Sequence, residues 1–277
     1  MSKIIFRILL FGSIIAISAI IGGAQRPTPT PDDEPDYIVP ARPTVSNPAE
    51  FQRPGVLQLE LGYDENFNSR GSFKNQRDFP LALRFAISHR LLVELDTDSP
   101  YSLTDPTGVT NRGAGDTQIG IQAVLQPENK SRPGIAFAYY IKIPTANENK
   151  GLGTGRVDHN FIGLISKTIN KTTIDFNAIY LLAGRTSGSG HASSGQAAFA
   201  LTQNITKSFG VQGEISGSSR NDMQPGVMYG LGVVTYQLNR RMVFDSGLRF
   251  GLKPDAPRVG VVAGITLGIA NLYKKHH

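Results

Sequence analysis

Charged and amide side chains recur at every second position along many segments of this sequence. Since alternate residues of a β-strand share a face, we expect these side chains to gather on one side of a sheet. Acids outnumber bases among them, and an unpaired charge in a dry core would be very unfavourable. They predict a wet, charge-lined path for a small-molecule solute, with a bracing ion-pair network as the alternative. The candidates are Glu60, Arg84, Glu94, Asp96, Asp116, Gln118, Gln122, Tyr140, Lys142, Asp158, Asn160, Asp175, Asn177, Glu214, Asp245 and Arg249.

Two short runs contain residue types that catalysis uses. In His191-Ala192-Ser193 the His and Ser share a strand face, as in outer-membrane hydrolases, but the Gly/Ser-rich residues 184–195 predict a loop too flexible for catalysis. In Asp158-His159-Asn160 neighbouring side chains point to opposite faces. The chain has no cysteine and no zinc, phosphate-loop or calcium-loop spacing. We expect no enzyme activity, no metal and no cofactor.

The elements that position these residues are strands. From residue 55 onward the hydropathy has period two in twelve segments, most of them about the length that crosses a bilayer. The connections after odd-numbered segments are mostly long and polar, as in residues 64–78, 97–115, 144–157, 184–195, 218–226 and 251–258. Those after even-numbered segments are mostly short, as in residues 88–90, 168–171, 206–208 and 238–240, with 127–133 the longest.

Loops sorted in this way are typical of outer-membrane barrels. The sequence therefore predicts an all-β fold, a closed antiparallel transmembrane β-barrel of about 12 strands over residues 55–273. The alternative is a secreted β-sandwich or soluble barrel. The aromatic residues Tyr63, Tyr180, Tyr229, Phe250 and Tyr273 are expected at the membrane interfaces.

The N-terminal residues have the three parts of a secretory signal peptide. Lys3 and Arg7 precede an apolar run over residues 8–21, and small residues follow. We expect residues 1–24 to be removed by cleavage between Ala24 and Gln25, with a retained membrane anchor as the alternative. Residues 274–277 are expected to be a short C-terminal tail.

Residues 25–54 contain eight prolines and predict a disordered linker. The alternative is a segment that folds into the pore or binds a periplasmic partner.

The formal charge of +6 is dispersed, so no basic patch indicates a nucleic-acid partner. The expected location is the bacterial outer membrane, with lipid, the barrel-assembly machinery and a small solute as partners.

Several short motifs resemble one known family. They are Gly113-Ala114-Gly115-Asp116, the run from Tyr140 to Thr145, the glycine-rich loop from Gly151 to Gly155, and Ser166-Lys167. The chain resembles the outer-membrane, transporter-like barrels described by "MetA-pathway of phenol degradation", over residues 55–273. The resemblance implies a channel for small molecules, including aromatic or hydrophobic compounds, that pass by passive diffusion. The alternatives are a plugged structural or surface-interaction barrel without transport and an outer-membrane hydrolase.

Overall fold

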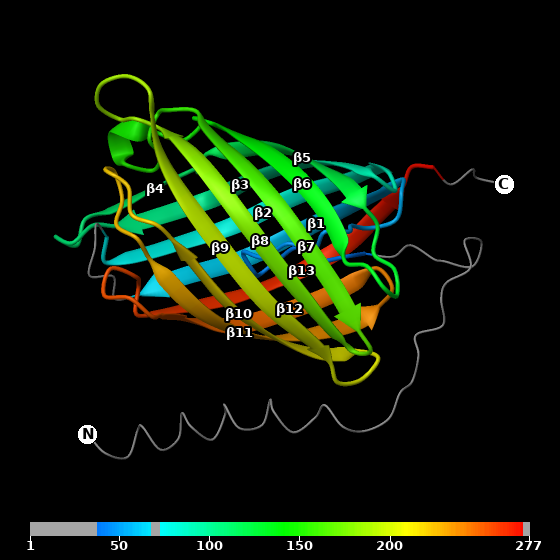
Figure 1. Cartoon of the computed structure of the whole chain (residues 1–277). Helices are drawn as coiled ribbons and strands as arrows, with labels where there is room; N and C mark the ends of the chain where they lie inside the picture. Colours follow the sequence, from blue (N-terminus) through cyan, green and yellow to red (C-terminus); the bar gives the residue numbers. More distant parts are fainter. Residues whose placement is uncertain (1–37, 68–72, 274–277) are drawn as a thin grey trace, which may run out of the picture. The chain divides into compact units, whose positions relative to one another are not determined.

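A single antiparallel sheet closes on itself in the computed structural model, which describes residues 38–67 and 73–273 (Figure 1). The first strand, β1 (Val56–Phe67), pairs with β2 (Asn75–Ser88) on one side and with β13 (Val259–Asn271) on the other. The wall continues through β3 (Leu91–Thr104), β5 (Thr117–Gln126), β6 (Gly134–Ile143), β7 (Asp158–Ile169), β8 (Thr172–Gly184), β9 (His191–Asn204), β10 (Phe209–Ser218), β11 (Met228–Asn239) and β12 (Met242–Gly251). The short β4 (Thr110–Gly113) pairs with the end of β3. The predicted closed barrel with twelve strands in its wall is confirmed.

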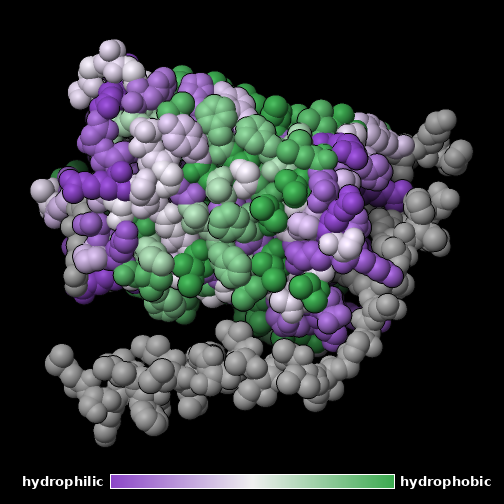
Figure 2. All heavy atoms as spheres, in the orientation of Figure 1, coloured by the Kyte–Doolittle hydropathy of each residue, from purple (hydrophilic) through white to green (hydrophobic). Residues whose placement is uncertain are grey.

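The outer surface of the barrel is apolar around its middle. Large side chains such as Ile121, Phe199 and Leu248 are exposed there. Figure 2 shows a hydrophobic band between two hydrophilic ends on the face in view. Lipid cannot hydrogen-bond a free strand edge, so closure and an apolar exterior are what a membrane-spanning sheet requires. No helix among the described residues is long and apolar enough to cross a membrane.

The two ends of the barrel differ in their connections. At the turn end, short turns such as residues 89–90 and 170–171 join the strands, and β1 begins and β13 ends there. At the loop end the connections are longer, and one of them contains the 3-10 helix η2 (Glu148–Lys150) (Figure 1, left side of the barrel). The predicted sorting of the connections is confirmed. In outer-membrane barrels the turn end faces the periplasm.

Several strands extend beyond the predicted bounds at the loop end. The sequence predicts loops over residues 64–78 and 97–115, but β1 continues to Phe67, β2 begins at Asn75 and β3 continues to Thr104. Asn75 and Thr104 are paired across β2 and β3. Outside the bilayer a strand needs no apolar face, so hydropathy alternation stops although backbone pairing continues.

The orientation of β11 corrects one prediction. The sequence places Tyr229 in an outward aromatic girdle, but Tyr229 shares its face with Leu231 and Val233, which are buried inside the barrel. The outward side chains include Val234 and Tyr236. The prediction was wrong because both faces of β11 are apolar or glycine from Met228 to Val234, so period two over this stretch does not identify the outer face.

Residues 38–55, which we name the lumen segment, lie inside the barrel. The sequence predicts a disordered linker over residues 25–54, and the described part of that range differs from the prediction. Its residues Ala49 and Gln52 are at most 1% exposed. The segment is held because the barrel wall supplies hydrogen-bond partners that composition cannot reveal. The predicted signal peptide, its cleavage site and residues 25–37 and 274–277 lie outside the described residues.

Candidate functional site: the occupied lumen

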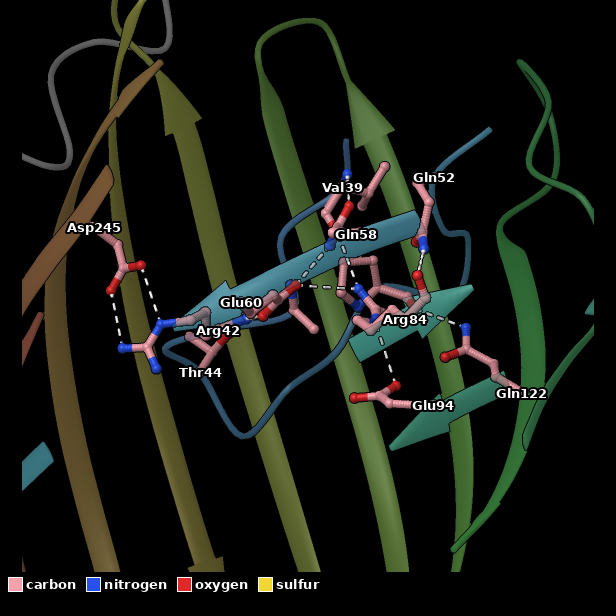
Figure 3. A network of polar contacts seen from close by, with 12 residues as sticks. Val39, Arg42, Thr44, Gln52, Gln58, Glu60, Arg84, Glu94, Gln122 and Asp245 are labelled. Carbon is pink, nitrogen blue, oxygen red and sulfur yellow. Dashed lines mark hydrogen bonds and ion pairs between the residues drawn. The ribbon is translucent and has the colours of Figure 1, made fainter. Parts of the chain in front are cut away.

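The first residues of the lumen segment lie along β1 (Figure 3). Inward side chains of β1 accept hydrogen bonds from the backbone N–H groups of these residues. The N–H of Val39 donates to Oε1 of Gln58 at 3.1 Å. The N–H groups of Ala41 and Arg42 donate to the two carboxylate oxygens of Glu60 at 3.0 and 3.2 Å. Glu60 therefore acts as an acceptor for the passing chain, which satisfies backbone donors that proline-rich sequence cannot pair with itself.

The opposite side of the wall holds the segment in the same way. The N–H of Ser46 donates to Glu214 at 2.7 Å. Asn47 and Asn177 make a reciprocal pair: the N–H of Asn47 donates to Oδ1 of Asn177 at 2.7 Å, and Nδ2 of Asn177 donates to the carbonyl of Asn47 at 2.9 Å. Strands β1, β8 and β10 thus fix one segment from different sides of the lumen.

Ala49 makes an apolar contact between the lumen segment and the barrel wall. It packs in a cluster with Ala136, Ala138, Tyr140, Ile162 and Leu164, which are inward residues of β6 and β7. Its N–H donates to Oγ of Ser166 at 2.8 Å, and its carbonyl accepts from Gln122 at 3.0 Å. The small side chains of β6 leave the room that the segment occupies.

Arg42 reaches from the segment across the junction of β1 and β13. Its guanidinium donates to the carboxylate of Asp245 at 3.3 and 3.4 Å and to the carbonyl of Ala263 at 2.9 Å. Gly62 and Gly264 are directly paired on these two strands. A Cβ added to Gly264 would lie 2.3 Å from Nε of Arg42, and one on Gly62 would lie 1.7 Å from Nη1. The glycine pair forms the space in which Arg42 lies.

Arg84 is the centre of a buried charge network (Figure 3). Its side chain is fully buried and lies 3.5 Å from Glu60 and 3.2 Å from Glu94. The hydroxyl of Tyr140 donates to the same Glu94 at 2.9 Å, and Arg84 also donates to the carbonyl of Val39 at 2.9 Å. One base is thus shared by two acids and ties the wall to the lumen segment.

Nearer the loop end two more bases pair with acids. Nζ of Lys142 lies 3.1 Å from Asp116 and 2.8 Å from Asp158. Arg249 contacts Asp64 at 2.7 Å. Asp78, Asp96 and Asp98 lie near these groups, and none of them has a basic partner within 4.0 Å in the described part of the chain.

A cavity of about 260 Å³ lies between the lumen segment and the loop-end wall. The segment contributes Arg42, Pro43, Thr44 and Asn47, while β1, β2, β3 and β5 contribute most of the wall. Its lining includes six acids: Glu60, Asp64, Glu94, Asp96, Asp98 and Asp116.

All sixteen residues predicted to line the lumen are on the inner face of the wall. Glu60, Arg84, Glu94, Gln122, Tyr140, Asp175, Asn177, Glu214 and Asp245 are buried; Asp96, Asp116, Gln118, Lys142, Asp158, Asn160 and Arg249 are half-buried. Their role in a substrate path stays a prediction.

Sequence reasoning missed Arg42, Asp64, Asp78 and Asp98. The last three stand in parts of β1, β2 and β3 that were predicted as loops, and continuing the parity of each strand into these loops would have placed Asp64 and Asp98 inward. Nothing in the sequence indicates the position of Arg42.

His159 and His191 lie on the outer face near the loop end. The hydroxyl of Tyr139 is 2.8 Å from Nδ1 of His159, and the rings of His159 and His191 are 5.5 Å apart. His159 was predicted to face outward, and it does. His191 begins β9 instead of lying in a loop, and Ser193 shares its exposed face. The structure shows no hydrogen bond between His191 and Ser193, both of which are among the described residues.

Solved structures with the same fold are outer-membrane proteins. An outer-membrane channel from Pseudomonas putida F1 superposes with a TM-score of 0.63 and 13% sequence identity, over 79% of this chain and 97% of that chain. The NanC porin gives a TM-score of 0.53 and 8% identity, over 77% of this chain and 99% of the porin. These identities establish a shared fold. A search of curated proteins found no significant match.

The closed wall, the apolar band and the sorted loops place this barrel in the bacterial outer membrane. Residues 41–268 match the sequence profile described as "Putative MetA-pathway of phenol degradation". That match includes nearly all of the barrel and most of the lumen segment, so the chain belongs to this family of outer-membrane barrels.

Proposed function

We propose that this protein is a passive outer-membrane channel for small molecules. One observation carries the proposal: the barrel encloses a polar cavity, and the segment that narrows the lumen is held there by hydrogen bonds and ion pairs. The wall closes through the pairing of β1 with β13, in which no residue from 38 to 54 takes part. The segment can therefore move while the wall remains paired. Lipid around the outer band and the barrel-assembly machinery during insertion are the partners that such a barrel needs.

Small aromatic compounds are the proposed solutes. The family description refers to phenol degradation, and the fold is shared with a channel from Pseudomonas putida F1. Part of the lumen wall is apolar and lined by small side chains, which would suit a ring that slides past without strong contacts. These residues are Ala136, Ala138, Ile162, Leu164, Ala198, Ala200, Leu231 and Val233.

The proposed channel works without catalysis. A serine nucleophile needs a base within hydrogen-bond reach, and His191 and Ser193 have no such contact. We expect the variant His191→Ala/Ser193→Ala to conduct as the unchanged protein does. A loss of conductance with retained folding would contradict this assignment.

The decisive test is conductance in planar lipid bilayers. The full chain is expected to give discrete openings, and deletion of residues 38–53 is expected to increase their size several-fold because the lumen segment narrows the pore. If the deletion does not fold, Arg42→Ala provides the same comparison with a full-length chain. A folded barrel without conductance, both with and without the segment, would contradict the proposal.

That last result would favour a plugged structural or surface-interaction barrel. The specific observation in its favour is the lumen segment, which reaches β1, β7, β8, β10 and β12 and therefore occupies much of the turn-end lumen.

A further inference from the structure

The charge of the lumen cavity is opposite to that of the whole chain. The chain has a formal charge of +6. The cavity lining contains six acids, and its one base is Arg42, whose guanidinium is already paired with Asp245. The positive charges of this protein therefore lie mostly elsewhere, and a solute in the cavity meets carboxylates.

The bases behind the lining do not neutralise these acids one for one. Arg84 is shared between Glu60 and Glu94. Lys142 is shared in the same way between Asp116 and Asp158. Each shared base leaves one negative charge, and Asp78, Asp96 and Asp98 add three carboxyl groups without a basic partner among the described residues. The imbalance is therefore a property of the site and does not depend on any single residue.

The placement of these acids is not explained by the stability of the wall. Asp64 and Asp78 are directly opposite each other on β1 and β2, and Arg249 pairs with Asp64 and not with Asp78. Asp98 faces Pro80, and Asp96 faces Ala82 and Gln118, which are neutral. A network that only braced the barrel would place bases at these positions, as it does around Arg84.

The cavity lies where a solute that crosses the barrel has to pass the acids. They belong to β1 and β3, with Asp116 just before β5, and the lumen segment closes the other side of the same cavity. A solute that enters from the loop end reaches the acids before it reaches the segment. Charge of one sign in a cleft with low-dielectric walls raises the local concentration of counter-ions by roughly 10- to 1000-fold.

We infer that the pore selects by charge: it admits cationic and neutral small solutes and excludes anionic ones. This inference rests on the proposed channel function and narrows its solute class. Aromatic amines and neutral phenols pass, whereas aromatic carboxylates and sulfonates are repelled. The selecting residues are the acids of the cavity, of which Asp96 and Asp98 have no basic partner within 4.0 Å among the described residues. Asp78 adds a further carboxyl group on β2, directly opposite Asp64.

The test measures the reversal potential of the full chain in planar bilayers across a KCl gradient. The expected sign is that of a cation-selective pore, with K⁺ preferred over Cl⁻ by roughly tenfold. Two further salts are then compared, each with one benzene ring on the organic ion. The ring is part of a cation in benzyltrimethylammonium chloride and part of an anion in sodium benzenesulfonate. The organic cation is expected to carry current and the organic anion is not.

The variant Asp78→Asn/Asp96→Asn/Asp98→Asn removes three carboxyl groups with little change of shape, and its cation preference is expected to fall several-fold. The matched control, Glu148→Gln/Asp222→Asn/Asp255→Asn, removes three exposed loop acids and should retain the preference. Conductance without cation preference, or a preference that the first variant retains, overturns the inference alone. Bilayers that show no conductance overturn the channel function and the inference together.

Discussion

The guanidinium of Arg42 lies against the backbone of Gly264, where any side chain would collide with it. Glycine at this position cannot be explained by a turn, because Gly264 is in the middle of β13 and is paired with Gly62. The wall is thus shaped to receive one side chain of the lumen segment. Through this contact, the absence of a side chain at Gly264 helps to keep the lumen segment in place inside the pore.

Gly264→Ala is expected to release Arg42. The new Cβ would displace the flexible guanidinium and not the backbone, so the ion pair with Asp245 is lost while the barrel still folds. Conductance in planar bilayers should rise, and protease should cut residues 38–55 faster. Gly232→Ala is the control, because nothing lies within 4 Å of a Cβ there. Equal effects of the two substitutions would show that the position of Arg42 does not matter.

A disulfide should lock the lumen segment in place. The natural chain has no cysteine, and Asn47 and Asn177 are in direct contact. The variant Asn47→Cys/Asn177→Cys is expected to conduct less when oxidised and to recover its conductance when a reductant is added. The conductance of each single variant should not change with the reductant. Conductance that stays the same after verified cross-linking would mean that solutes pass without movement of the segment.

Arg84 should be far more important for stability than an exposed arginine. Arg84→Met leaves Glu60 and Glu94 buried without their base, which should lower the free energy of unfolding by about 3–5 kcal/mol. Arg77→Met removes a pair with Glu65 in which the arginine side chain is 49% exposed, and should change the free energy of unfolding far less, because solvent screens an exposed pair. Urea titration of both variants in lipid vesicles measures the difference. Similar values would mean that water reaches Arg84.

A charged side chain introduced into the apolar band should lower the stability of the folded barrel. Phe199 faces outward within β9, and Phe199→Arg is expected to destabilise the folded barrel in vesicles by about 2–4 kcal/mol. Leu252 is also exposed but lies in the loop after β12, so Leu252→Arg should change stability by about 0–1 kcal/mol. The same vesicle titration compares them, and an equal effect would place the bilayer elsewhere on the barrel.

The sequence determined the parity of most strands and therefore the inner face of the wall. Residues such as Glu60, Asn177 and Arg249 could be placed because alternation is a property of each strand alone. Strand ends could not be placed at the loop end, because hydropathy reports contact with lipid and not backbone pairing. For β11 both faces are apolar or glycine from Met228 to Val234, so this stretch alone does not decide its orientation.

Only the tertiary structure decided what fills the lumen. The partners of Val39, Arg42 and Asn47 are 18 to 221 residues away in the chain. No local pattern encodes such contacts, since each depends on the closed wall that brings β1, β8 and β12 around one axis. The sequence by itself therefore specified a barrel with a charged interior. The closed fold decided that residues 38–55 occupy it and that the acids of β1 and β3, with Asp116 just before β5, border one cavity.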